Sequence, residues 1–486
     1  MNDFIILPRL YKRVKVLKCL SIKKDNSDIT SSNYKTKQAL KMKNVIRNIT
    51  IPLIMMFHVA LLAQNETPQL FEPATIKADI DTLISKLKDV HPTFLNHYET
   101  NNYKTQIDSI KKIITGPMTS LDFFRIMQPF VVIDGHTTLR YTGALNPNEE
   151  SPLFPFRVII FNDSLYIKES FSKHEVLVKG STIEKINGVS WEKIARNLLR
   201  YIPGEKESYK IKKLEKDFHI YMALVYGSFS DFSMTVDNSE FELKGAKWDD
   251  FQEPSKPKFV LRFYDNDIAY IYKRMFMPPK DFLHFMDSAF SVISQKQINH
   301  LVIDNLSGGG LTDLADSLMT YFTDKPYSLM AKKMTKISPL TKGLIEDKKS
   351  SGTLQDGYFI EEYPKHSADR ENRFTGSTYI LTGPLSYSTG TCFPAAAKYY
   401  KTALIVGEES GQPLLSNGDQ NQFILPGTKM FCITALSKVY MPGHNNDKIT
   451  GVLPDWEVNP TLEDLLDDKQ YALEYTLKSI RENKVR

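Results

Sequence analysis

The sequence predicts an α/β protein whose carboxyl-terminal half is built on a mostly parallel β-sheet. From residue 258 onward, short apolar segments of strand length alternate with stripes of helical period, and this order favours parallel strands joined by helices. Two further observations describe the rest of the chain: residues 72–130 have helical periodicity, and residues 153–245 are rich in strand and turn patterns. In parallel sheets the chemistry lies at the carboxyl ends of the strands, so functional residues are expected there.

Composition and charge narrow the class of protein. The 486 residues are 42% apolar and 24% charged, which is typical of soluble globular proteins and excludes a disordered, collagen-like or polytopic membrane chain. The net charge of +5 is concentrated at the amino terminus: residues 1–41 hold ten Lys/Arg and three Asp/Glu, and residues 42–63 add two Lys/Arg. The remainder has a net charge of −4, so no nucleic-acid partner is expected.

Residues 42–63 have the layout of a secretory signal peptide. A basic start that includes Lys43 and Arg47 precedes an apolar run, and cleavage is expected after Ala63. The run of ~14 residues is shorter than the ~20 that span a bilayer, and an uncleaved anchor is the alternative. We expect translation to start at Met42, residues 1–41 to be an upstream extension, and the protein to be exported to the periplasm or the cell exterior.

Three domains are predicted after the signal. Residues 64–148 form a helical domain, with stripes from Ile76 to Val90 and from Tyr103 to Ile114, and a third helix capped by Ser120. Residues 149–257 form a PDZ-like β-rich module, in which strands at 156–160 and 164–167 flank a turn, a further strand and tight turn span 180–189, and a helix spans 191–201. Its last residues, 246–257, are predicted to form a linker.

The third domain, residues 258–486, contains the repeated strand–helix pattern. Strands are predicted at 268–272, 301–304, 378–381 and 403–406, with helices at 282–293, 311–322 and 389–400. The strand at 378–381 is followed by a turn and a helix that begins near Ser388. A serine there lies at the positive end of the helix dipole, among free N–H groups that can hold an oxyanion. Ser386 or Ser388 is therefore a candidate nucleophile, although a helix cap is the commoner role for such a serine.

Two other segments have residue types that suit catalysis. Gly308, Gly309 and Gly310 follow the strand at 301–304, and glycines there allow the backbone to approach a ligand; a flexible loop is the plain alternative. No Lys-Ser/Thr follows, which excludes a Walker phosphate loop. His136, in the sequence Asp-Gly-His-Thr at 134–137, lies on a turn and is a candidate general base, although a lone histidine is more often structural.

Cysteine and histidine usage predicts neither a metal site nor a cofactor. The histidines are scattered without paired ligand spacing. Of the three cysteines, Cys392 and Cys432 remain after the expected cleavage; two buried free thiols are favoured over a disulfide between them.

The order of the motifs resembles the tail-specific (C-terminal-processing) serine protease family, in particular its tricorn-like and interphotoreceptor retinoid-binding protein-like branch. The resemblance covers about residues 72–480, and it implies a ClpP/crotonase-like α/β core. The motifs that carry it are Asp-Gly-His-Thr at 134–137, the PDZ-like turn at 180–188, the segment around Ser388, Gly-Glu-Glu-Ser-Gly at 407–411, Gly-Val-Leu-Pro-Asp at 451–455 and Thr-Leu-Glu-Asp at 461–464.

The resemblance implies a catalytic set and shows where this chain departs from it. In the processing branch a lysine after the Gly-Glu-x-Thr-Gly turn is the general base, but Gln412 stands there, and Lys398 should face away from Ser388. The tricorn-like branch uses the histidine of the Asp-Gly-His-Thr element, so Ser388 is implied as nucleophile and His136 as base. The implied oxyanion donors are the N–H groups of Thr389 and of Gly309 or Gly310.

Two parts of the implied set depart further from the family. The family has an acid shortly before the Gly-Val-x-Pro-Asp element; Lys448 falls near that place, and Asp447 is the candidate substitute, with a solvated loop charge as its plain reading. The glycine loop lacks the arginine of the family pattern and is shorter.

Two classes of function remain open on the sequence. The first is an exported serine-type endopeptidase that cuts peptides or proteins near unstructured carboxyl termini, with the PDZ-like module binding the tail as an added strand. The second is a catalytically silent relative that binds a peptide or small apolar ligand in the same cleft. An esterase-type hydrolase is disfavoured because the chain has no Gly-x-Ser-x-Gly elbow.

Overall fold

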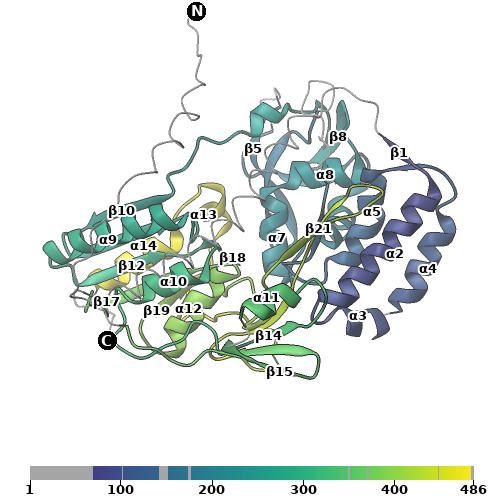
Figure 1. The fold of residues 1–486 in the computed structure, drawn as a ribbon. Coiled ribbons are helices and arrows are strands. Elements are labelled where there is room, and N and C mark those ends of the chain that lie inside the picture. The colour runs from purple at the N-terminus through teal and green to yellow at the C-terminus, as the bar shows by residue number, and fades with distance from the viewer. Residues whose placement is uncertain are drawn as a thin grey trace, which may run out of the picture. The chain divides into compact units, whose positions relative to one another are not determined.

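The computed structural model describes residues 69–100, 102–141, 152–172, 177–348, 351–368, 370, 373–446 and 448–482. The predicted upstream extension, the signal peptide and Asp447 lie outside these residues. Residues 66–486 form one compact unit, which is described below (Figure 1). Among the described helices, none combines the length and the apolar character that crossing a bilayer requires.

The first part of the unit is helical, as predicted. Thr119 rather than Ser120 caps the third predicted helix, because its side chain accepts the Asp122 N–H while Asp122 accepts the Thr119 N–H in a capping box. A short helix after Pro92 was not predicted. The elements are β1 (Leu70–Phe71), α2 (Pro73–Val90), α3 (Phe94–Thr100), α4 (Tyr103–Ile113), β2 (Met118–Thr119), α5 (Ser120–Val131) and β3 (Thr138–Arg140).

An antiparallel sheet with the strand order β4-β5-β6-β8-β9 forms the next part. The turn at Asn162 and Asp163, both with positive φ, joins β4 and β5 as expected for a tight hairpin. Helices α7 and α8 were not predicted within this β-rich stretch, since α7 has few apolar residues and those of α8 surround the helix, so that neither shows a clear apolar stripe. The elements are β4 (Phe156–Phe161), β5 (Ser164–Ser170), β6 (Thr182–Ile186), β7 (Val189–Ser190), α6 (Trp191–Leu198), η1 (Leu199–Tyr201), α7 (Glu207–Lys216), α8 (Phe218–Tyr226), β8 (Asp231–Val236), β9 (Ser239–Lys244) and η2 (Trp248–Phe251).

The predicted parallel sheet is present, with the strand order β10-β11-β12-β17-β19-β24. Only β10 pairs antiparallel with its neighbour; the other pairs are parallel. Its elements are β10 (Phe259–Tyr264), β11 (Ile268–Lys273), α9 (Pro279–Gln295), β12 (His300–Asp304), β13 (Ser307–Gly308), α10 (Thr312–Met319), β17 (Ser377–Thr382), β18 (Leu385–Ser386), α12 (Thr389–Tyr399), β19 (Leu404–Gly407), β24 (Trp456–Glu457), α13 (Leu462–Leu466) and α14 (Tyr471–Arg481).

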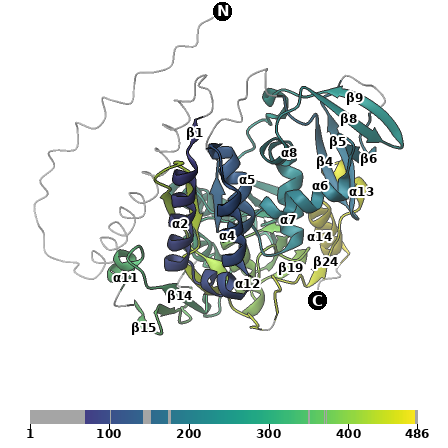
Figure 2. The ribbon, with the colours of Figure 1, turned by 90° about the vertical axis from the view of Figure 1, so that its right-hand side faces the viewer.

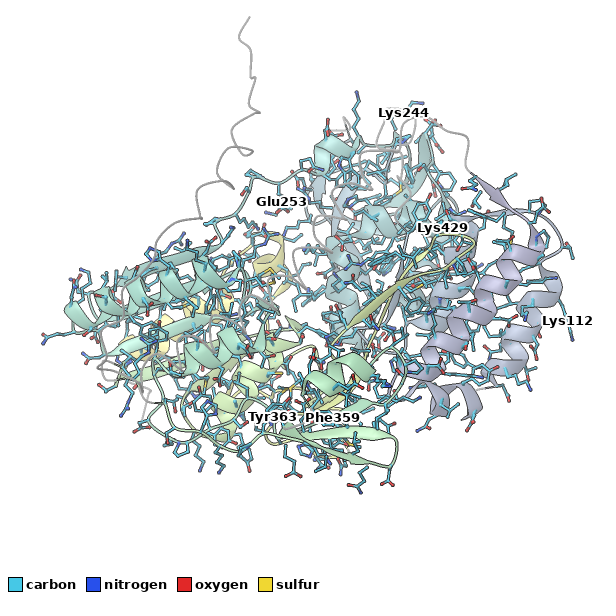
Figure 3. All side chains as sticks on the ribbon, in the orientation of Figure 1. Lys112, Lys244, Glu253, Phe359, Tyr363 and Lys429 are labelled. Carbon is cyan, nitrogen blue, oxygen red and sulfur yellow. The ribbon has the colours of Figure 1, made fainter. Side chains whose placement is uncertain are left out.

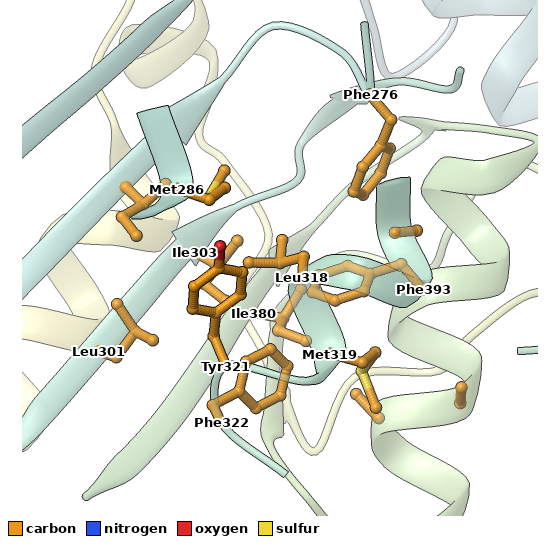
Figure 4. Close-up of a cluster of buried hydrophobic side chains, with 14 of the residues drawn as sticks. Phe276, Met286, Leu301, Ile303, Leu318, Met319, Tyr321, Phe322, Ile380 and Phe393 are labelled. Carbon is orange, nitrogen blue, oxygen red and sulfur yellow. The ribbon is translucent and has the colours of Figure 1, made fainter. Parts of the chain in front are cut away.

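Helices cover both faces of this sheet, because side chains alternate between the faces along each strand. Ile303 and Ile380 pack with Phe393 of α12 and with residues of α9 and α10, as Figure 4 shows. Val302 and Leu381 point to the other face, where they pack against Leu473 and Leu477 of α14. The strands are therefore apolar throughout, which is the pattern of a sheet buried on both sides.

A second sheet, antiparallel and with the order β15-β16-β14-β23-β20, was not predicted. Phe359, labelled in Figure 3, belongs to β16 of this sheet and is buried. A smaller sheet pairs β3 of the helical part with β22, so residues near 138 and near 432 lie side by side. The remaining elements are β14 (Lys332–Lys336), α11 (Lys342–Asp347), β15 (Thr353–Gln355), β16 (Tyr358–Glu362), β20 (Leu415–Gly418), β21 (Asn421–Ile424), β22 (Phe431–Thr434) and β23 (Ser437–Tyr440).

Candidate active site

Ser388 lies at the sharp turn between β18 and the amino terminus of α12. Its backbone has φ 59° and ψ −127°, a conformation that costs energy for any residue other than glycine and that is found mainly where function requires it. The residue is half-buried. Ser386, the other serine that the sequence left open, is fully buried and donates its hydroxyl to the Asn305 oxygen, so its role is structural.

The glycine loop lies against this turn. A side chain added at Gly309 would come within 3.1 Å of the Ser388 Cβ, so only glycine allows this approach. The Gly310 oxygen accepts the Thr389 hydroxyl at 2.7 Å, and this bond ties the loop to the first turn of α12. The N–H of Thr389 has no acceptor in the described part of the chain and remains available to a ligand. The loop is shorter than the family pattern, but Gly309, Gly310 and Thr389 meet beside Ser388.

Gln412 occupies the place that a lysine holds in the processing branch. Its Oε1 accepts the Ser388 N–H at 2.6 Å, and its Nε2 donates to the Ser416 hydroxyl at 2.8 Å and to the Asn417 oxygen at 3.3 Å. Gln412 is almost fully buried. The residue therefore connects the Ser388 turn to strand β20, on which Asn417 lies.

His136 faces the same strand from the helical part of the unit. The backbone of Asn417 acts on its ring and raises its pKa, and Nδ1 has no hydrogen-bond partner in the described residues. Burial lowers the pKa of His136 below its ordinary 6.5, although the carboxylates of Asp134 and Asp419 act in the opposite direction. The imidazole is therefore neutral over a wider pH range than that of an exposed histidine, as a general base must be.

Asp134 holds the turn on which His136 lies. Its carboxylate accepts the His136 N–H at 2.8 Å, the His91 ring at 2.8 Å and the Asn417 side chain at 3.0 Å. Burial favours the neutral carboxyl, but His91 and these hydrogen bonds outweigh it and hold the pKa of Asp134 well below its usual range. The sequence reasoning named Asp134 only as part of a motif and did not find His91 or Asn417, which have no local pattern that marks them.

A second connection between the two turns runs through Tyr387. Its ring centroid lies 5.3 Å from that of His136 and 4.4 Å from that of Tyr209, with which it stacks. Its hydroxyl donates to Glu205 Oε2 at 2.6 Å. His136 and the residue before Ser388 are thus in ring contact, although the two lie about 250 positions apart in the sequence. No hydrogen bond joins Ser388 Oγ to His136 in the described chain.

The other predicted residues are placed as follows. Lys398 pairs with Asp455 of the Gly-Val-Leu-Pro-Asp element and not with Ser388, as predicted. Cys392 and Cys432 are buried free thiols. Asp447, the predicted acid, lies outside the described residues. Within the part of the chain that the structure describes, no three His, Cys, Asp or Glu side chains gather as a metal site requires.

A cavity of about 250 Å³ is lined by residues of the second sheet and of the segments beside it, among them Lys333, Glu361 and Asp419. Lys333 is buried and forms ion pairs at 3.2 Å with both Glu361 and Asp419. Asp419 is exposed, and its carboxylate acts on the His136 ring through its charge.

Comparison with known proteins agrees with this geometry. Residues 267–458 match the sequence model of peptidase family S41. No curated protein sequence matches the chain. Among solved structures, a serine-to-alanine mutant of CPAF is similar with a TM-score of 0.61 at 11% identity, over 83% of this chain and 96% of that chain. Mature CPAF is similar with a TM-score of 0.59 at 13% identity, over 83% and 95% of the two chains.

At these identities the solved structures establish a shared fold, and the S41 match covers the sheet strands and helices that surround the Ser388 turn. The motif order, the fold and the match agree: residues 267–458 form a domain of the peptidase family S41 type, and the protein is a serine peptidase.

Proposed function

We propose that this serine peptidase uses Ser388 as its nucleophile and His136 as its general base. The observation that carries the proposal is the chain of hydrogen bonds from the Ser388 N–H through Gln412 to Asn417, whose side chain donates to Asp134 of the His136 turn. These bonds hold the hydroxyl-bearing turn and the imidazole-bearing turn against the same strand.

In the proposed reaction the His136 imidazole accepts the Ser388 hydroxyl proton while Oγ attacks the carbonyl carbon of the peptide bond. The negative charge that develops on the carbonyl oxygen is stabilised by the N–H groups of Thr389 and of Gly309 or Gly310. The C–N bond then breaks, and His136 returns the proton to the leaving amine. Water, deprotonated by the same imidazole, hydrolyses the acyl-enzyme.

The amide side chain of Gln412 cannot be the general base, so another residue has to take that role. An amide does not accept a proton near neutral pH, and both ends of its side chain are already bound, to the Ser388 N–H and to the Ser416 hydroxyl. Gln412 therefore holds the turn in place and takes no part in proton transfer.

A fluorophosphonate probe tests the proposal. The wild-type protein should be labelled at Ser388, Ser388→Ala should abolish labelling, and the exposed Ser377→Ala should leave it unchanged. His136→Ala should slow labelling and peptide turnover by ~10³-fold, whereas the exposed His284→Ala should not. If the folded wild-type protein is not labelled, the alternative of a silent relative that binds a peptide or small apolar ligand replaces this proposal.

We also propose that the substrate presents an unstructured carboxyl-terminal tail that adds as a strand to the edge of the antiparallel module. Strand β4 lies at one end of that sheet, and helix α7 packs against it (Figure 2). The Ile160 N–H of β4 donates to Glu215 Oε1 at 2.8 Å, so a side-chain carboxylate now occupies a position where a peptide would bind. A tail that binds there must displace Glu215.

Export is part of the proposal and rests on the sequence alone. Amino-terminal sequencing of the secreted protein should give a chain that begins at Gln64. A mature chain that still contains Cys19 would contradict both the signal and the start at Met42.

A further inference from the structure

A carboxyl group stands between the two turns that hold the proposed nucleophile and base. Glu205 precedes helix α7, and its Oε2 accepts the Tyr387 hydroxyl at 2.6 Å. The backbone of Gly135 lies close enough to the same carboxyl to lower its pKa, whereas Glu205 Oε1 is buried and has no hydrogen-bond partner in the described residues. Tyr387 immediately precedes Ser388 and Gly135 immediately precedes His136, so a single side chain contacts the neighbour of each reacting residue.

The Tyr387 side chain is closely packed on both sides. A Cβ added at Gly135 would lie 2.1 Å from the Tyr387 hydroxyl oxygen, which means that the Gly135 backbone lies directly against the tyrosine. Tyr209 of α7 stacks on the other side of the Tyr387 ring at 4.4 Å. The tyrosine is thus confined between α7 and the His136 turn, and its hydroxyl can reach Glu205 in only this position.

The charges that face Glu205 come from three elements. Asp134 of the His136 turn repels an ionised Glu205, Lys210 of α7 attracts it, and the Tyr387 and Tyr209 hydroxyl groups are neutral near neutral pH. Burial and Asp134 together raise the pKa of Glu205 to about 8, although its hydrogen bonds act in the opposite direction. The carboxyl is therefore neutral at neutral pH, so it bridges the turns without placing a second negative charge beside Asp134.

We propose that Glu205 is a positioning residue of the peptidase: by binding Tyr387 and Gly135 together it fixes the separation between Ser388 and His136. The inference rests on the proposed roles of Ser388 and His136. Glu205 touches neither reacting group, and its effect passes through the residues that precede them. The bridge matters because a displacement of about 1 Å between nucleophile and base is enough to slow acyl transfer ~10²-fold.

The test compares three single variants, Glu205→Ala, Glu205→Gln and Tyr387→Phe, and the double variant Glu205→Ala/Tyr387→Phe. The controls are Glu207→Ala and Glu207→Gln, at the exposed start of α7. The readouts are the rate constant of fluorophosphonate labelling, the fraction of protein labelled, and kcat and KM on a peptide. Misfolding lowers the labelled fraction, whereas a displaced base lowers the rate constant of the folded molecules.

We expect Glu205→Ala and Tyr387→Phe each to lower the rate constant and kcat by ~10–100-fold with KM little changed, and the double variant to be no slower than either single variant. Glu205→Gln, which has the shape of the neutral carboxyl and keeps an acceptor oxygen, should stay within ~3-fold of the wild type near pH 7. Three results would contradict the positioning role of Glu205. They are labelling of Glu205→Ala at the wild-type rate, additive effects of Glu205→Ala and Tyr387→Phe in the double variant, and a rate constant for Glu205→Gln as low as that of Glu205→Ala.

The labelling experiment distinguishes an error in the proposed role of Glu205 from an error in the proposed peptidase mechanism. A wild-type protein that is not labelled contradicts the roles of Ser388 and His136. Normal labelling of the wild type without coupling between Glu205 and Tyr387 contradicts only the positioning role. If Glu205→Ala does not fold, Tyr387→Phe still tests the inference, because it keeps the ring and removes only the hydroxyl that Glu205 binds; a Tyr387→Phe protein labelled at the wild-type rate would overturn it.

Discussion

The backbone N–H of Ser388 donates to Gln412 Oε1 at 2.6 Å, and this bond decides between two ways of activating the serine. A lysine at position 412 would place an amine beside the nucleophile, but a glutamine places an acceptor that holds the backbone. The base must then come from elsewhere, and the His136 turn reaches the same strand through Asp134, whose carboxylate accepts from the Asn417 side chain. Five predictions follow from these contacts.

Replacing Gln412 should affect both stability and activity. Gln412→Met keeps the length of the side chain but leaves the buried Ser388 N–H without an acceptor, which costs about 1–3 kcal/mol in the free energy of unfolding. We expect lower thermal stability and a slower labelling rate than in the exposed control Gln420→Met. Thermal unfolding and labelling kinetics measure the two effects, and a Gln412→Met protein as stable and as fast as the control would contradict the assigned role.

Activity should persist at a lower pH than an ordinary histidine base would allow. Burial keeps His136 neutral, so kcat/KM should fall only as the pH drops through a value below 6.5. The Asp419 carboxylate raises the pKa of His136, and its removal in Asp419→Asn should shift the acid limb to a still lower pH. A pH–rate profile measures both; an acid limb above 6.5, or a shift to higher pH in Asp419→Asn, would be incompatible with this account.

A methyl group at position 135 should disrupt the site. In Gly135→Ala the new Cβ would lie 2.1 Å from the Tyr387 hydroxyl oxygen, so the tyrosine or the His136 turn has to move. We expect kcat to fall by ~10²-fold or more. Gly116→Ala is the matched control, since no atom lies within 4 Å of its added Cβ. Equal turnover in the two variants would show that the contact between Gly135 and Tyr387 does not position the base.

Removing Glu215 should expose the proposed tail-binding edge. In Glu215→Ala the Ile160 N–H of β4 becomes free to pair with a peptide, and we expect a fluorescent peptide with a free carboxyl terminus to bind at least ~5-fold tighter than to the wild type. The exposed Glu207→Ala serves as the control. Fluorescence anisotropy measures the affinity; unchanged affinity in Glu215→Ala would place tail binding elsewhere or exclude it.

The dependence of stability on pH should reveal the neutral Glu205. Its pKa is about 8 in the folded protein and ordinarily 4.5, so between these values the folded state holds a proton that the unfolded state has released. The free energy of unfolding therefore decreases with rising pH across this window, by up to about 1.4 kcal/mol per pH unit from this group. Glu205→Gln removes the contribution. Chemical denaturation at several pH values measures the free energy of unfolding of the wild type and of Glu205→Gln. As the pH rises, the stability of Glu205→Gln should increase relative to that of the wild type. If the two free energies change in parallel with pH, Glu205 is ionised in the folded state.

The sequence by itself determined the parallel core and the position of its strands. β11, β12, β17 and β19 lie within a few residues of the predicted ranges, because strands buried on both faces are continuous apolar runs that are visible without any long-range information. The turn at Ser388 and the glycine loop were also visible locally. The local pattern left both Ser386 and Ser388 open, since both precede the same helix, and only the family resemblance pointed to Ser388.

Only the tertiary structure decided which residues meet. Ser386 is excluded because the Asn305 oxygen accepts its hydroxyl, and Asn305 directly follows strand β12, about 80 positions earlier in the chain. His136 comes to the site because β3, which follows its turn, pairs with β22 almost 300 positions later. Glu205, Asn417 and His91 belong to the site through contacts of this kind, and no spacing in the sequence marks them. Local patterns report which face of an element is buried, whereas a site is made by side chains from elements that approach each other only when the whole chain has folded.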